Sequence, residues 1–169
     1  MRRVDETVGR GNAGGETQVK GPSMIVKQIL AMKAGPDEIV TIRPDTTVAE
    51  AARLLSERRI GAVVVSSDGR RAEGILSERD IVRELGRSGA EVLDRKASEM
   101  MTSKVSTCVC SDDALTVLER MTQGRFRHLP VVDDKGMMLG VVSIGDAVFA
   151  RLKELNAEKE ALTGMIMGN

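Results

Sequence analysis

This chain contains two copies of one unit. Residues 41–80 align with residues 107–146 at a constant offset of 66 positions and without a gap. Apolar character coincides along the alignment as well, for example at Leu76/Val142. An internal repeat of this length predicts two similar structural units that pack together. The identical pairs are Thr41/Thr107, Arg59/Arg125, Val65/Val131, Asp68/Asp134, Gly74/Gly140, Ser77/Ser143 and Asp80/Asp146.

Each copy predicts the same order of elements: strand, helix, strand, turn, strand and helix. The pattern Thr47-x-x-Glu50 is a capping box that begins a helix, and apolar residues recur after it at helical spacing. Ser67-Asp68-Gly69 is a hairpin-type turn between two β-branched runs. The second copy ends in a longer helix, from residue 143 onward. The fold class expected is α/β, and the expected elements of the first copy are strands at 40–42, 60–65 and 74–76 and helices at 47–59 and 77–85.

The charge balance is not that of a nucleic-acid-binding protein. The chain has 25 Lys and Arg residues and 25 Asp and Glu residues, and its aromatic residues are two Phe. Proteins that bind nucleic acids normally need a basic excess for the phosphates and aromatic side chains for stacking. We therefore expect no nucleic-acid partner.

The few reactive side chains indicate neither a metal site nor catalysis. Cys108 and Cys110 would point to the same face of a predicted strand, too close along the chain for an easy disulfide. Together with His128 they give three candidate metal ligands, whereas a structural zinc site uses four. The sequence contains no P-loop, nucleophile elbow or recognisable reactive-cysteine motif. We expect no metal and no enzymatic activity.

The N-terminal part differs from the repeats. Residues 1–23 are rich in glycine and charge and poor in large apolar residues, which predicts a disordered tail, with Met24 as an alternative functional start. This part has no apolar leader segment, and the aliphatic run at 60–65 is far shorter than the roughly 20 residues that a membrane span needs. We expect a cytoplasmic protein without a membrane partner.

A shared motif lies at the end of both copies. Residues 74–80 read GILSERD and residues 140–146 read GVVSIGD, so Gly-x-x-Ser-x-x-Asp occurs at equivalent positions. With the matching order of elements, these segments resemble a tandem pair of cystathionine-β-synthase (CBS) domains, the Bateman module, over about residues 24–152. The resemblance implies two βαββα repeats related by pseudo-twofold symmetry. The expected division is a first CBS repeat at 24–90, a second at 91–152 and a C-terminal helical extension at 153–169.

The two Ser-x-x-Asp pairs permit two interpretations. Ser77 and Asp80, like Ser143 and Asp146, lie where a strand passes into a helix, so each pair can be a capping box with no further role. A helix N-terminus also favours anions, and a carboxylate can accept two hydrogen bonds from a ribose diol. The resemblance implies this second role, in which the Asp binds the ribose hydroxyls of an adenine nucleotide and the Ser helps to hold the ribose or phosphate.

The two copies differ in their basic residues. Arg79 has Gly145 as its counterpart, while Arg127 and His128 replace a Gly-Ala pair of the first copy. Arg79 is equally consistent with a solvated surface charge, and His128 with a packed strand residue. In the functional interpretation, these three side chains face ligand phosphates. The resemblance also implies apolar walls for adenine pockets, at positions that ordinary core residues would suit equally well: Ile42, Ile60, Cys108 and Phe126.

The resemblance implies a non-catalytic regulatory module that senses energy or redox state. Its expected ligands are AMP, ADP, ATP or NAD(H), bound in clefts between the repeats. Two alternatives stay open: a ligand-free scaffold for dimerisation or protein docking, and a sensor of S-adenosylmethionine, which needs no basic groups for phosphate. A homodimer is expected because apolar positions recur on the outer helices, at Val82, Leu85, Val148, Phe149 and Leu152.

Overall fold

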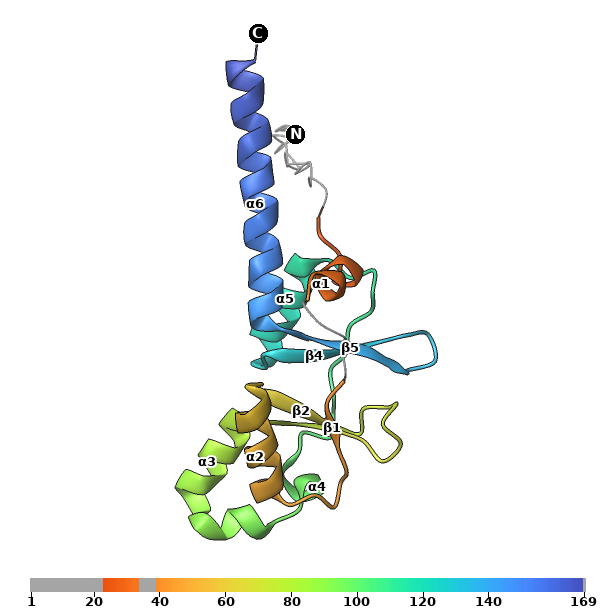
Figure 1. Cartoon of the computed structure of the whole chain (residues 1–169), viewed down its shortest axis with the longest axis vertical. Coiled ribbons are helices and arrows are strands. Elements are labelled where there is room, and N and C mark those ends of the chain that lie inside the picture. The colour runs from red at the N-terminus through yellow and green to blue at the C-terminus, as the bar shows by residue number, and fades with distance from the viewer. Residues whose placement is uncertain (1–22, 34–38, 169) are drawn as a thin grey trace, which may run out of the picture.

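The computed structural model describes residues 23–33 and 39–168, so the tail expected at 1–23 lies outside the described residues except for Ser23. It contains two α/β units, with strands toward the middle of the molecule and helices toward its ends (Figure 1). The elements are α1 (Val26–Met32), β1 (Thr41–Ile42), α2 (Val48–Arg58), β2 (Ala62–Val65), β3 (Gly74–Ser77), α3 (Glu78–Ser88), a 3₁₀ turn (Ala90–Asp94), α4 (Ala97–Met100), α5 (Ala114–Gly124), β4 (His128–Val132), β5 (Met138–Ser143) and α6 (Ile144–Met167).

The two sheets have the same register. In the first unit, β1 runs parallel to β2, and β2 pairs antiparallel with β3. In the second unit, β4 pairs antiparallel with β5, and Cys108 forms an isolated parallel bridge with Val131. That bridge is equivalent, at the offset of 66, to the pairing of Ile42 with Val65. The repeat in the sequence is therefore a repeat of the structure.

Local sequence explains where helix α2 begins and ends. Thr47 Oγ1 accepts a hydrogen bond from the Glu50 N–H, and the Glu50 carboxylate accepts one from the Thr47 N–H. The helix ends at Arg59, which has a left-handed backbone with φ of 53°, and Arg125 ends α5 in the same way with φ of 56°. This conformation is uncommon for a residue other than glycine. It turns the chain sharply, so β2 begins at Ala62 and not at residue 60 as the pattern predicted.

The short helices α1 and α4 are exchanged between the units. Helix α1 precedes the first repeat, yet Val26 is buried in the core of the second. Helix α4 begins the second half of the chain, yet Ala97 is buried in the core of the first. Their backbones are held in equivalent ways: the Val26 N–H donates to the Asp112 carbonyl at 2.8 Å, and the Ala97 N–H donates to the Thr46 carbonyl at 2.7 Å.

Because of this exchange, the boundary between the two repeats in the sequence is not the boundary between the two packed units. The division expected at residues 90 and 91 follows the sequence repeat, whereas each packed unit includes a helix from the other side of that boundary. The repeat alignment could not reveal it because the two helices are related by an offset of 97 − 26 = 71 positions and share no motif.

The glycine of each motif lies beneath an exchanged segment. A Cβ atom added at Gly74 would overlap the Met101 side chain, and one added at Gly140 would lie 2.9 Å from Leu30 Cδ2. Leu30 and Met101 are themselves 71 positions apart, so the two contacts are equivalent. The close packing of the segments over the sheets therefore depends on glycine at these positions.

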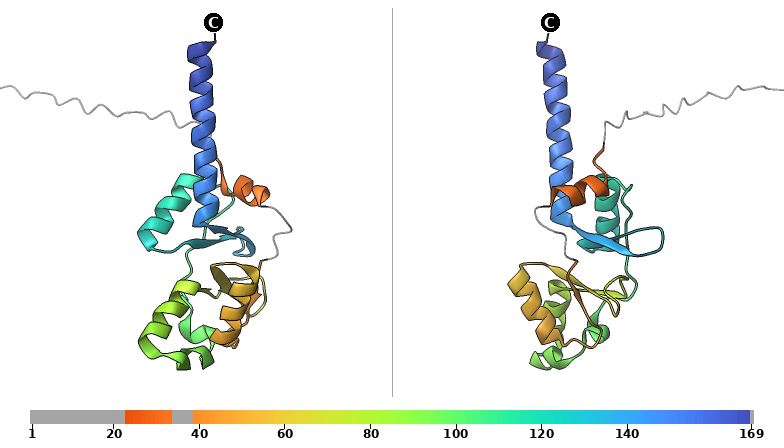
Figure 2. Two further views of the ribbon diagram at one scale, coloured as in Figure 1. Left: turned by 60° about the vertical axis from the view of Figure 1, so that its left-hand side comes forward. Right: turned by 45° about the vertical axis from the view of Figure 1, so that its right-hand side comes forward.

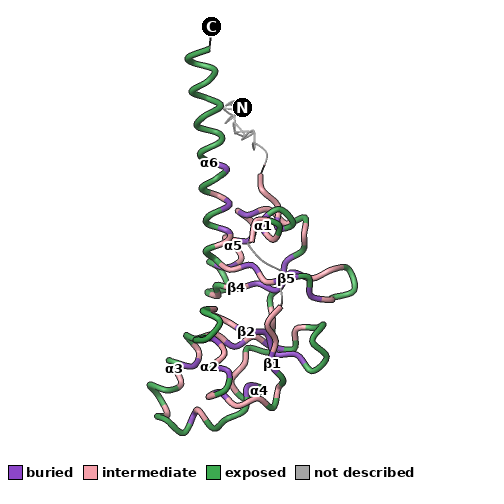
Figure 3. The backbone as a smooth tube through the Cα atoms, viewed as in Figure 1, coloured by how far each residue is buried: buried purple, intermediate pink, exposed green. Residues whose placement is uncertain are grey.

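The last helix is much longer than its counterpart in the first repeat. Helix α6 has 24 residues, whereas α3 has 11. Its first half packs on the second unit through Ala147, Ala150 and Glu154. The remainder projects away from both units and is exposed to solvent (Figures 2 and 3). None of the helices within the described ranges is both long and apolar enough to cross a membrane.

Candidate functional site

Two clefts lie between the units, and each is lined by both repeats. The first, of about 260 Å³, combines the motif at 77–80 with residues 124–128, where α5 turns into β4. The second, of about 340 Å³, combines Ser143 and Asp146 with residues 59–62, where α2 turns into β2. One repeat thus supplies the motif of each cleft, and the other repeat supplies the facing wall.

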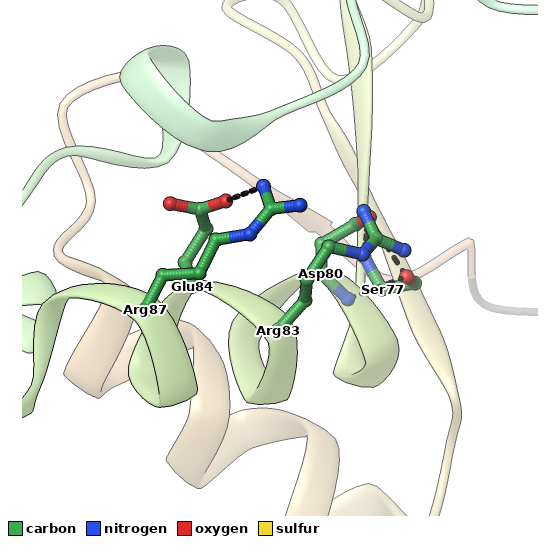
Figure 4. Close-up of polar contacts among 5 residues, drawn as sticks. All are labelled: Ser77, Asp80, Arg83, Glu84 and Arg87. Atoms are coloured by element: carbon green, nitrogen blue, oxygen red, sulfur yellow. Dashed lines mark hydrogen bonds and ion pairs between the residues drawn. The ribbon is translucent and has the colours of Figure 1, made fainter.

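In the first cleft, Ser77 and Asp80 form a capping box at the start of α3. The Asp80 carboxylate oxygen Oδ2 accepts hydrogen bonds from the Ser77 hydroxyl at 2.7 Å and from the Ser77 N–H at 3.1 Å. Its other oxygen, Oδ1, lies 3.2 Å from Nη1 of Arg83 (Figure 4). A carboxylate oxygen has two lone pairs, so Oδ1 can accept a further hydrogen bond from a ligand.

The second cleft repeats this arrangement with a different cation. The Ser143 N–H donates to Asp146 Oδ2 at 2.9 Å, and the Asp146 N–H donates to Ser143 Oγ at 3.1 Å. Lys33 Nζ, at the end of the exchanged helix α1, lies 3.1 Å from Asp146 Oδ2 and donates to the Val141 carbonyl at 2.8 Å. Capping explains the local geometry of both motifs, and both carboxylates also face a cleft.

His128 contributes to the walls of both clefts, as Gly61 does. Burial lowers the pKa of the His128 imidazole below its usual 6.5. The carboxylates of Glu78 and Asp146 act in the opposite direction, while Lys33 and Arg127 add to the lowering. The lowered pKa favours a neutral imidazole at neutral pH, which can accept one hydrogen bond and donate another.

A model of one protein family matches both halves of the chain. The CBS domain model matches residues 26–87 and residues 97–153. The chain belongs to the CBS-domain family. The two clefts are therefore clefts of a tandem CBS pair, and the resemblance predicted from the two Gly-x-x-Ser-x-x-Asp segments is confirmed.

Known CBS-domain proteins resemble this pair over most of its length. The mitochondrial CBS domain-containing protein CBSX3 of Arabidopsis thaliana is 36% identical over 128 residues, which are 73% of this chain and 62% of that protein. The crystal structure of the CBS-domain containing protein ATU1752 from Agrobacterium tumefaciens is 39% identical with a TM-score of 0.70, covering 75% of this chain and 98% of that one. The chain thus spans less than two thirds of the plant protein and nearly all of the bacterial structure.

Some of the similar structures contain AMP. The CBS domain protein PAE2072 from Pyrobaculum aerophilum, solved in complex with AMP, is 28% identical with a TM-score of 0.62. The similarity covers 72% of this chain and 88% of that one. Binding of an adenine nucleotide therefore occurs in a relative with the same fold.

The residues expected at the sites of this CBS pair are only partly brought together. Arg79, Arg127 and Phe126 line the first cleft, and Ile60 lines the second. Among the described residues that line the two clefts, neither Ile42 nor Cys108 occurs, so their role as pocket walls stays a prediction. Both side chains are buried in the cores at equivalent positions, Ile42 in β1 before α2 and Cys108 at the isolated bridge before α5.

The structure adds basic residues to the CBS clefts that the sequence analysis did not select. Arg83, Lys104 and Arg125 line the first cleft, while Lys33 and Arg59 line the second. The identity of Arg59 and Arg125 in the repeat alignment was a usable signal for one pair. No signal in the repeat alignment indicated Lys33 or Lys104, because both reach the clefts through the exchanged segments. No group of three or more His, Cys, Asp or Glu side chains within the described ranges is arranged to hold a metal ion.

Proposed function

We propose that this CBS pair is a non-catalytic regulatory module that binds adenine nucleotides in its two clefts. The observation that carries the proposal is that each cleft is lined by an Asp carboxylate at a helix N-terminus and by at least one arginine from the facing repeat. The relative solved with AMP supports the choice of an adenine nucleotide. Ligands of the proposed class are AMP, ADP, ATP and NAD(H).

Each part of the cleft suits one part of such a ligand. The Asp80 or Asp146 carboxylate accepts hydrogen bonds from the ribose diol, which are stronger than neutral ones because the acceptor is charged. The positive end of the α3 or α6 dipole and the nearby cations favour the phosphates. Phe126 in the first cleft and Ile60 in the second offer apolar surface to the adenine ring.

Regulation follows from the position of the clefts between the units. A ligand that touches both walls binds one relative placement of the repeats better than any other, and it shifts the population toward that placement. The signal passes to a separate protein or to a second copy of the chain. The exposed apolar side chains on α3 and α6 suit a homodimer, because Val82 and Phe149 are 68% and 61% exposed.

Thermal unfolding with a panel of ligands tests the proposal. A ligand at one hundred times its Kd stabilises the native state by about 2.7 kcal/mol, which raises the Tm of a chain of this size by roughly 5–10 °C. The panel contains AMP, ADP, ATP, NAD and NADH, with S-adenosylmethionine as the alternative ligand. Unchanged melting curves with every nucleotide would favour the scaffold function instead. Light scattering of the same sample tests the dimer, since a mass of 18.2 kDa would show a monomer.

A further inference from the structure

The repeat allows the two clefts to be compared position by position. Four pairs of polar residues have the same character in both clefts, and each pair lies at equivalent positions. The pairs, with the first cleft named first, are Ser77/Ser143, Asp80/Asp146, Arg125/Arg59 and Lys104/Lys33.

At three positions the first cleft carries an arginine where the second repeat or the facing wall has an uncharged residue. Arg79, Arg83 and Arg127 line the first cleft. Their counterparts at the offset of 66 are Gly145, Phe149 and Gly61, none of which carries a charge. The first cleft is thus lined by five Lys or Arg residues and two carboxylates, Glu78 and Asp80, whereas the second is lined by two cations and one carboxylate.

In each cleft one cation is already paired with the motif carboxylate: Arg83 with Asp80 in the first and Lys33 with Asp146 in the second. Lys33 is already paired with Asp146 at 3.1 Å and donates to the Val141 carbonyl. Arg59 supplies the remaining cationic side chain among the described lining residues. The rest of this cleft is mainly aliphatic, with side chains from both units: Ile39, Val40, Ile60, Val64, Ile75 and Val141.

We propose that the two clefts select ligands of different charge. The first cleft binds an adenine nucleotide with two or more phosphates, and the second binds an adenosine compound with at most one phosphate. This inference rests on the proposed function and specifies which ligand each cleft takes. Guanidinium groups bind phosphate oxygens in a planar, bidentate way and stay charged at all relevant pH values. A polyphosphate in the second cleft would lose water without enough cations to replace it, which is costly.

A site-resolved binding experiment separates the two clefts without any substitution. Amide NMR spectra of the full chain are recorded while ATP, adenosine or inorganic tripolyphosphate is added. The amides of residues 77–80 report on the first cleft, and those of residues 143–146 report on the second. We expect ATP and tripolyphosphate to shift the first set at concentrations at least ten-fold lower than the second, and adenosine to shift the second set first.

Substitutions at the positions that differ then test whether the arginines cause the difference in ligand selection. Arg79→Ala with Arg127→Ala should weaken ATP binding at the first cleft by ten-fold or more and leave adenosine binding at the second within two-fold. Gly145→Arg should strengthen ATP binding at the second cleft. Gly145 has room for a side chain, since a Cβ there meets only Ser143 Oγ at 3.6 Å. The control is Arg87→Ala, which removes a charge from α3 at a residue paired with Glu84 and outside both clefts.

The outcomes distinguish this inference from the proposed function. If no adenine compound shifts either set of amides, the proposed function itself is wrong. If ATP binds both clefts with equal affinity, or if the arginine variants bind ATP as well as Arg87→Ala does, only the partition by charge is wrong. Adenosine that prefers the first cleft, or that binds neither, also overturns the partition.

Discussion

The imidazole of His128 lies directly against Gly61, at the place where the walls of the two clefts meet. A Cβ atom at Gly61 would lie 3.1 Å from His128 Cε1 and 3.3 Å from Nε2. Both residues line both clefts, and they come from opposite repeats. The small residue of one unit therefore makes room for the ring of the other, and the ring forms part of the wall of both clefts.

This location gives His128 a measurable effect on stability. Its pKa is lowered by burial in the native state, whereas an unfolded histidine has a pKa of about 6.5. The unfolded chain therefore binds more protons, and the free energy of unfolding should fall as the pH is lowered through about 6.5. His128→Asn should remove this part of the pH dependence, measured by urea unfolding at several pH values. A wild-type protein that becomes more stable over the same acid range would contradict the lowered pKa.

The motif glycines give a second prediction. Gly74→Ala and Gly140→Ala should each lower the free energy of unfolding by about 1–3 kcal/mol, because the added methyl group overlaps Met101 or presses on Leu30. Gly86→Ala is the matched control, since it lies in α3 with nothing within 4 Å of the added atom. It should stabilise the protein by about 0.5–1 kcal/mol. Equal effects of the three substitutions on denaturant midpoints would show that the exchanged segments do not pack closely on the sheets.

A third prediction concerns Glu154, whose side chain holds the segment before α1 against α6. Its side chain is 2% exposed, accepts a hydrogen bond from the Met24 N–H and pairs with Arg151 at 2.7 Å. Glu154→Ala should therefore cost about 1–3 kcal/mol in unfolding free energy. Glu158→Ala removes a carboxylate that is 43% exposed and 3.9 Å from the same arginine. This control should change stability by less than about 0.5 kcal/mol, and a similar loss in both variants would refute the special role of Glu154.

The two cysteines should react at very different rates. Burial raises the pKa of the Cys108 thiol to about 12, so almost no thiolate is present at about pH 8. A thiol reagent should modify only the half-buried Cys110 in the native protein and both cysteines after denaturation. Cys110→Ser should abolish the fast reaction. Rapid modification of two thiols under native conditions would place Cys108 at the surface and not in the core.

The sequence predicted the repeated parts of this structure well. The offset of 66 predicted the same order of elements in both units, and the structure adds that equivalent residues pair in each, as Ile42 with Val65 and Cys108 with Val131 show. The capping boxes at Thr47, Ser77 and Ser143 also form as their local patterns indicated. Local chemistry within a few residues decides these features, and the sequence displays it directly.

The remaining features depend on contacts between distant segments. Lys33 reaches Asp146 only because α1 packs on the second unit, and no pattern near Lys33 indicates that partner. The arginines at 79 and 127 were selected separately, but their meeting in one cleft depends on how the two units face each other. Ile42 and Cys108 are buried in the cores, and the sequence could not place them there because an apolar strand residue suits a core and a ligand pocket equally well.

The exchange of α1 and α4 also determines how this protein can be divided. A fragment cut at residue 90 would carry α1 without the core that buries Val26, and it would leave its own sheet without Ala97 of α4. Neither half could then complete its hydrophobic interior, so separately expressed halves should regain the fold only when mixed. In a gene fusion or a recombination event, the smallest segment that can be moved as a folded unit is the whole pair, from Met24 to at least Glu154.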